Sequence, residues 1–226
     1  KERFLMGNMI LVIGDPGSGK STALESLDPE TTVLIKPNNK ALPFRGGAVK
    51  YNVDKKNVVI NKEFKDLEAT LTAINNSTSG KIKTVVVEDL THYFSHRVMK
   101  DAKTTGFQKW SDMAVYCFNA LIKFESNLRD DLDVIVIGHT DRSVDSLGNT
   151  VIGLQTPGKL LENNIKIPSY FTYVLHTDVI ESNGKMEYRF LTNSDGIKLA
   201  KTPRGCFDKY IPNDYKLVLD TIDKYQ

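Results

Sequence analysis

Short apolar runs recur along the first two thirds of the chain, and polar or turn-forming residues bound each of them. The runs are rich in β-branched side chains, which is typical of strands buried on both faces of a parallel sheet. They comprise Met9–Ile13, Thr31–Ile35, Thr84–Val87 and Val134–Ile137, with shorter candidates at Val49–Val53 and Val58–Ile60. The pattern therefore predicts a mainly parallel sheet.

Segments with helical spacing lie between these runs. After the first run, apolar residues at helical spacing reach Leu27, and Pro29 predicts the end of that helix because a residue before proline resists helical geometry. Helical spacing also covers Phe64–Ile74 and most of residues 92–131, with a break near 104–106. Alternating strands and helices predict an α/β fold, with helices flanking the sheet.

The last third of the chain has a different pattern. The runs Tyr170–Ile180 and Met186–Thr192 alternate between apolar and polar residues. They flank Asn183-Gly184, a dipeptide that favours the tight turn of an antiparallel hairpin. The remaining predictions are a strand at Ile197–Ala200, a terminal helix at Tyr215–Tyr225 and a polar loop without periodicity over residues 141–155.

Length and composition limit the organisation. A chain of 226 residues suits one α/β domain. We expect a single domain over 1–226, with a core at about 9–140 and a C-terminal β extension and helix at about 165–226. The net charge of +2 gives no global basic field, so any nucleic-acid binding must come from a local patch.

Cysteine usage and hydropathy predict a cytoplasmic protein. Cys117 and Cys206 lie far apart without metal-ligand spacing, which indicates reduced thiols. No apolar run approaches membrane-spanning length, and the start Lys1–Arg3 lacks the apolar core of a signal peptide. Because the first residue is not Met, we expect a trimmed or truncated N-terminus.

One segment carries a strong chemical signal. It fits the pattern G-x-x-x-x-G-K-[S/T] between an apolar strand and a helical segment, the context of a phosphate-binding loop rather than a chance glycine turn. Its residues are Gly14, Asp15, Pro16, Gly17, Ser18, Gly19, Lys20 and Ser21, followed by Thr22. Backbone N–H groups of such a loop, and the start of the next helix, face phosphate oxygens. Lys20 is expected to reach the β- and γ-phosphates, and the Ser21 hydroxyl to ligate Mg²⁺.

Two carboxylates follow the valine run. Glu88 and Asp89 stand at the end of a predicted central strand, where an acid completes a nucleoside triphosphate site by holding Mg²⁺. The plainer interpretation is a strand that ends at a polar turn. The upstream phosphate loop favours the functional interpretation.

Several runs together resemble RecA-like P-loop ATPases. The runs Val87–Thr91, Val136–Thr140 and Ile197–Arg204 occur in the order typical of that superfamily. Leu42–Gly46 and Gly106–Trp110 are similar to a bacteriophage branch, which includes phage ATP-binding proteins and RecA-like single-strand annealing proteins. The resemblance extends from Gly14 to about Asp214.

The resemblance implies roles for individual residues. The phosphate loop would bind ATP and Mg²⁺, and Glu88 and Asp89 would occupy the positions of the metal-binding acid and its neighbour. His139 would be a polar sensor of the γ-phosphate, although a strand-end histidine packed into the core is the plainer interpretation. The basic residues expected to reach a neighbouring subunit's nucleotide, in a ring or filament, are Lys198, Lys201 and Arg204.

The chain departs from this family at one position. RecA-like enzymes usually carry a catalytic glutamate at the end of the strand that follows the phosphate-loop helix. Here that strand ends in Ile35-Lys36-Pro37, without an acid. Either Glu88 or Asp89 orients the attacking water, or hydrolysis is slow.

Candidate contacts to single-stranded DNA lie in two places. Cations mixed with Phe107 and Trp110 are typical of single-strand binders, although Trp110 also fits an apolar helix face. The second place is the segment 141–155, which carries one cation against two acids. The candidate cations are Arg97, Lys100, Lys103, Lys109 and Arg142.

The expected function is an ATPase, stimulated by single-stranded DNA, in phage recombination, annealing or replication. Its expected cofactors are ATP and Mg²⁺, and its partners are single-stranded DNA, copies of itself and phage single-strand-binding or replication proteins in the bacterial cytoplasm. One alternative is a nucleotide-dependent interaction module, similar to a helicase loader, with weak hydrolysis. The other is a small-molecule or nucleotide kinase, for which residues 141–155 offer too few arginines over the phosphates.

Overall fold

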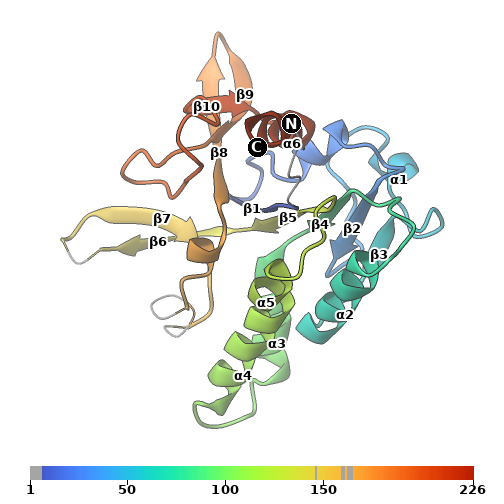
Figure 1. The fold of residues 1–226 in the computed structure, drawn as a ribbon. Helices are drawn as coiled ribbons and strands as arrows, with labels where there is room; N and C mark the ends of the chain where they lie inside the picture. Colours follow the sequence, from blue (N-terminus) through green and yellow to red (C-terminus); the bar gives the residue numbers. More distant parts are fainter. Residues whose placement is uncertain (1–6, 146, 159–160, 162–164) are drawn as a thin grey trace.

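Eight strands form one sheet in the computed structural model, which describes residues 7–145, 147–158, 161 and 165–226. The strand order is β3-β2-β4-β5-β1-β8-β9-β10 (Figure 1). The strands from β3 to β8 are parallel, whereas β9 and β10 are antiparallel. The strands are β1 (Met9–Ile13), β2 (Thr32–Lys36), β3 (Val58–Ile60), β4 (Thr84–Val87), β5 (Asp133–Gly138), β8 (Tyr173–Ser182), β9 (Lys185–Leu191) and β10 (Tyr210–Pro212).

Helices cover both faces of this sheet (Figure 1). Leu11 and Ile13 of β1 pack into a core with α2, α3 and α4, whereas Ile10 and Val12 face a second core with α6. The helices are α1 (Gly47–Lys50), α2 (Phe64–Asn75), α3 (Leu90–Lys100), α4 (Gln108–Cys117), α5 (Lys123–Glu125) and α6 (Tyr215–Tyr225), and a π turn, Phe118–Ile122, joins α4 to α5. The expected fold class, an α/β fold with a mainly parallel sheet and an antiparallel C-terminal extension, is confirmed.

The helix predicted from about Gly19 to about Leu27 is shorter than expected. It is a 3₁₀ helix, Thr22–Ser26, and its last residues precede Pro29, as the sequence predicted. The C-terminal helix α6 packs on the same side of the sheet, where Val218 and Ile222 share a core with Leu24. A helix this short has a small dipole, so it would contribute less to phosphate binding than the expected longer helix.

Two other segments also differ from the predictions. The predicted strand Val49–Val53 is not a strand: Val49 and Lys50 end the short helix α1, and a bend and a turn follow. Residues 141–155, predicted to be a loop, form an antiparallel hairpin of β6 (Thr140–Val144) and β7 (Thr150–Leu154) that projects from the main sheet (Figure 1). Most of its side chains are exposed, so the strands lack the alternation that marks a half-buried sheet.

The C-terminal hairpin and helix agree with the sequence. Asn183 and Gly184 have φ angles of +54° and +72°, the left-handed geometry that the turn between β8 and β9 requires. Asp214 caps α6, where its Oδ1 accepts a hydrogen bond of 2.9 Å from the Leu217 N–H. The predicted strand Ile197–Ala200 makes only one isolated bridge, between Ile152 and Lys198. Cys117 and Cys206 are free and buried, consistent with the expected reduced thiols.

The strand order determines where the polar residues meet. β5 lies between β1, which leads into the phosphate loop, and β4, which leads into Glu88 and Asp89. His139 directly follows β5. Because these strands are parallel, all these side chains lie at one edge of the sheet, the edge where open α/β sheets bind ligands.

Candidate functional site

The phosphate loop follows β1 and depends on glycine at three positions. Gly17 and Gly19 have φ angles of +78° and +94°, which other residues rarely adopt. A Cβ on Gly14 would lie 1.6 Å from Oγ1 of Thr177. The loop therefore lies directly against β8, and no larger residue fits at Gly14.

Side chains from β6 and β8 hold the loop in place. The Ser18 hydroxyl lies 2.6 Å from Oγ1 of Thr177 and donates a hydrogen bond of 2.6 Å to the Asp15 carbonyl. The Thr140 hydroxyl donates to the Asp15 carboxylate. The loop is thus fixed before any ligand binds, which lowers the entropic cost of binding an anion.

Lys20 is buried inside the loop. Its Nζ donates hydrogen bonds of 2.6 Å and 2.7 Å to the carbonyls of Gly14 and Asp15. Burial lowers the pKa of Lys20 to about 8, although the nearby carboxylates of Asp89 and Asp15 favour its charged form. The partners of this ammonium are neutral carbonyls, so a phosphate oxygen offers it a stronger, charge-assisted hydrogen bond.

Glu88 and Lys36 form an ion pair beside the loop. The Lys36 Nζ lies 3.5 Å from Oε2 of Glu88, and both side chains are mostly buried. Lys36 also donates to the backbone carbonyl of Lys40. The strand β2 therefore ends in a cation that pairs with Glu88.

Asp89 lies among histidines. It adopts left-handed geometry, with φ of +66°, just before α3, and its side chain does not cap that helix. Its Oδ2 lies 3.4 Å from Nε2 of His139 and forms a short contact with Nδ1 of His92. Burial opposes ionisation of Asp89, but hydrogen bonds and charge from His139 and His92 outweigh it and hold its pKa below the ordinary value.

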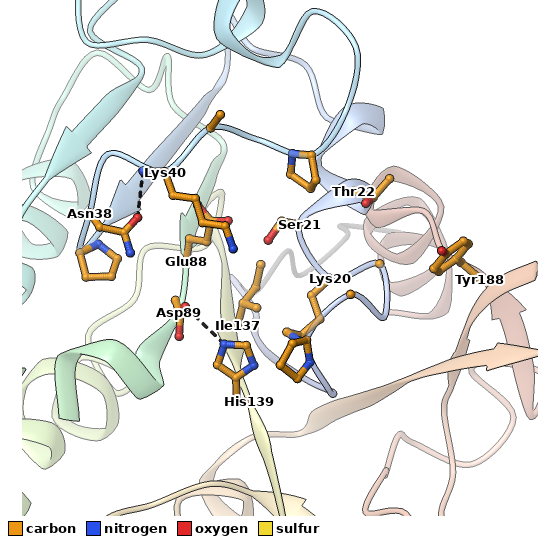
Figure 2. A pocket seen from close by; sticks show the side chains of 16 residues that line it. Lys20, Ser21, Thr22, Asn38, Lys40, Glu88, Asp89, Ile137, His139 and Tyr188 are labelled. Atoms are coloured by element: carbon orange, nitrogen blue, oxygen red, sulfur yellow. Dashed lines mark hydrogen bonds and ion pairs between the residues drawn. The ribbon is translucent and has the colours of Figure 1, made fainter. Parts of the chain in front are cut away.

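These groups surround a cavity of about 390 Å³, which is large enough for a nucleotide. Figure 2 shows Lys20 and Ser21 facing Glu88, Asp89 and His139 across it. The cavity is lined by Pro16, Gly17, Gly19, Lys20, Ser21, Thr22, Pro37, Asn38, Lys40, Ala41, Pro43, Glu88, Asp89, Ile137, His139 and Tyr188. The sequence-predicted loop residues and acids are thus brought together.

Two tyrosines of the C-terminal region also belong to this site, and sequence reasoning missed both. The Tyr188 ring lines the cavity beyond Thr22 and is 44% exposed (Figure 2). The Tyr215 hydroxyl donates a hydrogen bond of 2.8 Å to the Lys20 carbonyl, and its ring stacks on Phe190. The alternation in β9 and the start of α6 were visible in the sequence, but their proximity to the loop was not.

The basic residues proposed to act across a subunit interface lie outside the cavity lining. The Lys198 Nζ forms an ion pair with Asp178, which also pairs with Arg189 at 2.7 Å. The Lys201 Nζ donates a hydrogen bond of 3.2 Å to the Ser169 carbonyl. Arg204 is exposed, and its side chain has no ion-pair partner among the described residues. Of the three cations, Arg204 is the most available to a neighbouring molecule.

Several candidate DNA contacts are engaged within the chain. Arg97 pairs with Asp101 at 2.5 Å, and Lys100 pairs with Glu63 at 3.2 Å. The Lys109 Nζ lies 5.4 Å from the centre of the Trp110 ring. Lys103 and Arg142 are exposed, and neither side chain has an ion-pair partner within the part of the chain that the structure describes.

Comparisons with known proteins give only weak likenesses. No family model and no curated protein matches the chain. Among solved structures, the flagellar accessory protein FlaH from Methanocaldococcus jannaschii is 12% identical with a TM-score of 0.48, covering 92% of this chain and 85% of FlaH. The RadB recombinase is 14% identical with a TM-score of 0.47, covering 88% of this chain and 93% of RadB. Within the described residues, no helix has both the length and the apolar character that a membrane crossing needs.

Proposed function

We propose that this protein is a RecA-like ATPase, a single domain that binds ATP with Mg²⁺ and acts on single-stranded DNA in phage recombination, annealing or replication. One observation carries the ATPase part: the phosphate loop and two carboxylates converge on one nucleotide-sized cavity, with His139 between them. Phosphoryl transfer depends mainly on positioning and on neutralising charge, and these residues supply both.

The carboxylates suit Mg²⁺. Oδ1 of Asp89 is a buried oxygen without a hydrogen-bond partner, and Oε2 of Glu88 has only its ion pair with Lys36. Mg²⁺ prefers such hard oxygen ligands and keeps several waters. Ser21, Glu88 and Asp89 would hold the ion directly or through water, and the ion would neutralise charge on the β- and γ-phosphates.

The chain's own residues would perform the remaining steps. Lys20 would exchange its backbone carbonyl partners for β- and γ-phosphate oxygens. Glu88 or Asp89 would accept a hydrogen bond from the attacking water and so orient it. His139 would contact the γ-phosphate from the end of β5, and Arg204 of a neighbouring copy would complete the site.

Tyr188 is our candidate for the nucleobase contact. Thr22 and Tyr188 line the end of the cavity away from Glu88 and Asp89 (Figure 2). With the phosphates at Lys20, the base of a bound nucleotide would extend toward this exposed ring, and stacking of a base on an aromatic side chain contributes about 1–3 kcal/mol. Tyr188→Phe should keep nucleotide affinity, whereas Tyr188→Ala should lower it, measured with a fluorescent ATP analogue.

The DNA part is supported by the surface near the turn between α3 and α4. Phe107 is 87% exposed, and Lys103 is an exposed cation close to it in sequence. An exposed aromatic ring beside a cation suits an unpaired base and its phosphate. Arg142 on the projecting β6–β7 hairpin provides a second contact point.

A weakly hydrolysing interaction module is the second candidate, and the Lys36–Glu88 ion pair favours it. A carboxylate neutralised by a lysine orients water less well than a free one. In this alternative the nucleotide would control binding to a replication protein, and turnover would be very low.

Steady-state ATP hydrolysis with and without single-stranded DNA tests these functions, with Lys20→Ala as the blank. Strong stimulation by DNA that disappears in Lys20→Ala supports the recombination ATPase. Nucleotide binding without turnover supports the interaction module. Substantial turnover that DNA does not change overturns the DNA-dependent function and directs attention to a phosphate acceptor, as in a kinase.

A further inference from the structure

We propose that Asp89, His92 and His139 form a binding site for a divalent transition-metal ion such as Zn²⁺ or Co²⁺, which shares Asp89 with the Mg²⁺ site expected for ATP. The three side chains each offer one ligand atom, and these atoms all lie within 4.8 Å of one another. No other group of three histidine, cysteine or acidic side chains this close was found among the described residues.

The fold brings these residues together from two elements. Asp89 and His92 are three residues apart, at the start and in the first turn of α3. His139 comes from the end of β5, and a hydrogen bond of 2.9 Å from its N–H to Oγ1 of Thr91 ties it to α3. Backbone contacts of this kind hold ligands in place before a metal binds, which improves metal affinity.

The separations suit a small metal ion. A tetrahedral ion with bonds of about 2.0–2.1 Å places its ligand atoms about 3.3–3.4 Å apart. The Asp89 Oδ2 and His139 Nε2 are 3.4 Å apart. The His92 side chain is half-exposed, so its short contact with Asp89 can open by a small rotation to admit the ion.

The contacts within the cluster leave one carboxylate oxygen unused. Both imidazoles face the same carboxylate oxygen, Oδ2 of Asp89. Oδ1 of Asp89 is buried and has no hydrogen-bond partner. A metal ion at the centre of the cluster would take a lone pair from each neutral imidazole and would satisfy the carboxylate as well.

The ligand set selects the class of ion. Imidazole nitrogen suits Zn²⁺, Co²⁺ and Ni²⁺, whereas Mg²⁺ prefers oxygen ligands. Two histidines and one carboxylate leave at least one coordination position for water or for a ligand. Because Asp89 and His139 also line the nucleotide-sized cavity, that position can take a phosphate oxygen, and a bound transition metal would compete with Mg²⁺ for Asp89.

Titration of the full chain with Co²⁺, in the absence of nucleotide and Mg²⁺, tests this site. We expect one Co²⁺ per chain, detected by visible absorption, and displacement by Zn²⁺ but not by a large excess of Mg²⁺. His92→Ala should weaken binding more than about tenfold, since loss of a residue that only orients a metal ligand already costs about 10–100-fold. His96→Ala is the matched control, because His96 lies one turn further along α3 and outside the cluster; it should bind Co²⁺ as the wild type does.

Three results would overturn the inference: no stoichiometric Co²⁺ binding, equal affinity in His92→Ala and the wild type, or displacement of Co²⁺ by Mg²⁺. His139→Ala gives a second test from another element, with circular dichroism to verify folding. Binding of a fluorescent ATP analogue with Mg²⁺ is measured in parallel. If the wild type binds Co²⁺ through His92 but binds no nucleotide, the metal site stands and the proposed ATPase function falls.

Discussion

Lys20 in the nucleotide-sized cavity and the cations Lys198 and Arg97 outside it have different kinds of partner. Within the cavity, the Lys20 ammonium donates hydrogen bonds to the neutral carbonyls of Gly14 and Asp15. Outside it, Lys198 forms an ion pair with Asp178, and Arg97 forms one with Asp101. A cation that donates to carbonyls forms a stronger, charge-assisted hydrogen bond when a phosphate binds. A cation that is paired with a carboxylate must first lose that ion pair. Counting cations along a sequence therefore overestimates the number available to an anionic ligand.

The distinction has exceptions, since Lys201 lies outside the cavity lining but donates to the Ser169 carbonyl. The Lys36–Glu88 ion pair is a second exception, and it tests the distinction. It lies at the cavity, yet its cation is held by a carboxylate. If the distinction holds, Lys36 serves mainly to stabilise the fold and to lower the negative charge at the cavity, and Lys20 serves the ligand.

The largest effect should come from removing Lys20, the cation that donates hydrogen bonds to carbonyls. Lys20→Ala should lower ATP turnover by about 100-fold or more, since removal of one preorganised donor at a reacting group has this effect. Phosphate release measures it. Lys216→Ala is the control, because Lys216 pairs with Asp220 on the exposed side of α6 and outside the cavity lining. Equal activity in Lys20→Ala and the wild type would contradict the assigned role of the loop.

The second largest effect should come from removing Lys36, the buried cation that forms an ion pair with a carboxylate. Lys36→Met should lower the free energy of unfolding by about 3 kcal/mol, since Glu88 is left buried without its cation. Urea denaturation measures this change. The double variant Lys36→Met with Glu88→Gln should recover much of the loss, and a single variant as stable as the wild type would show that the ion pair contributes nothing.

Nucleotide affinity should also depend on pH through Lys20. Its pKa of about 8 means that the ammonium is present below pH 8 and is lost as the pH rises above it. If bound phosphate keeps Lys20 protonated, affinity should fall above pH 8 with a slope approaching about tenfold per pH unit. A fluorescent ATP analogue measures this from pH 7 to pH 9.5, and Lys20→Ala should show no such slope. If the affinity of the wild type does not change between pH 7 and pH 9.5, the charge of Lys20 does not contribute to nucleotide binding.

The smallest effect is expected at Lys198. Asp178 keeps Arg189 when Lys198 is removed, so Lys198→Ala should change the free energy of unfolding by less than about 1 kcal/mol. Chemical denaturation measures it, with Lys201→Ala for comparison. ATP turnover measured against protein concentration sharpens the result: a large loss of turnover in Lys198→Ala, absent in Arg204→Ala, would show that Lys198 leaves Asp178 to reach a neighbouring subunit.

The site could be predicted as far as it depends on contiguous residues. Gly14 to Ser21 and the pair Glu88-Asp89 are local patterns, and the parallel strands bring them to one edge of the sheet. Tyr188 and His92 were missed because their roles depend on packing between segments far apart in the chain. No local pattern shows that β9 passes the phosphate loop or that His92 faces His139.

The errors in secondary structure have a common cause. The helix after the phosphate loop was predicted to be longer than Thr22–Ser26, but α6 packs on the same side of the sheet. The hairpin of β6 and β7 was missed because its strands pair mainly with each other and remain exposed. In both places hydrophobic periodicity does not report the conformation: the first segment shares a core with α6, and the second forms by local strand pairing.

The sequence by itself determined the parallel strands, the C-terminal hairpin and the phosphate loop, since buried apolar runs and glycine geometry are properties of neighbouring residues. Only the tertiary structure decided which charges are free. It paired Lys36 with Glu88 and Lys198 with Asp178, and it brought His92 and His139 to one oxygen of Asp89. The physical reason is that charge interactions act over a few ångströms in space, and residues that close in space can lie anywhere along the chain.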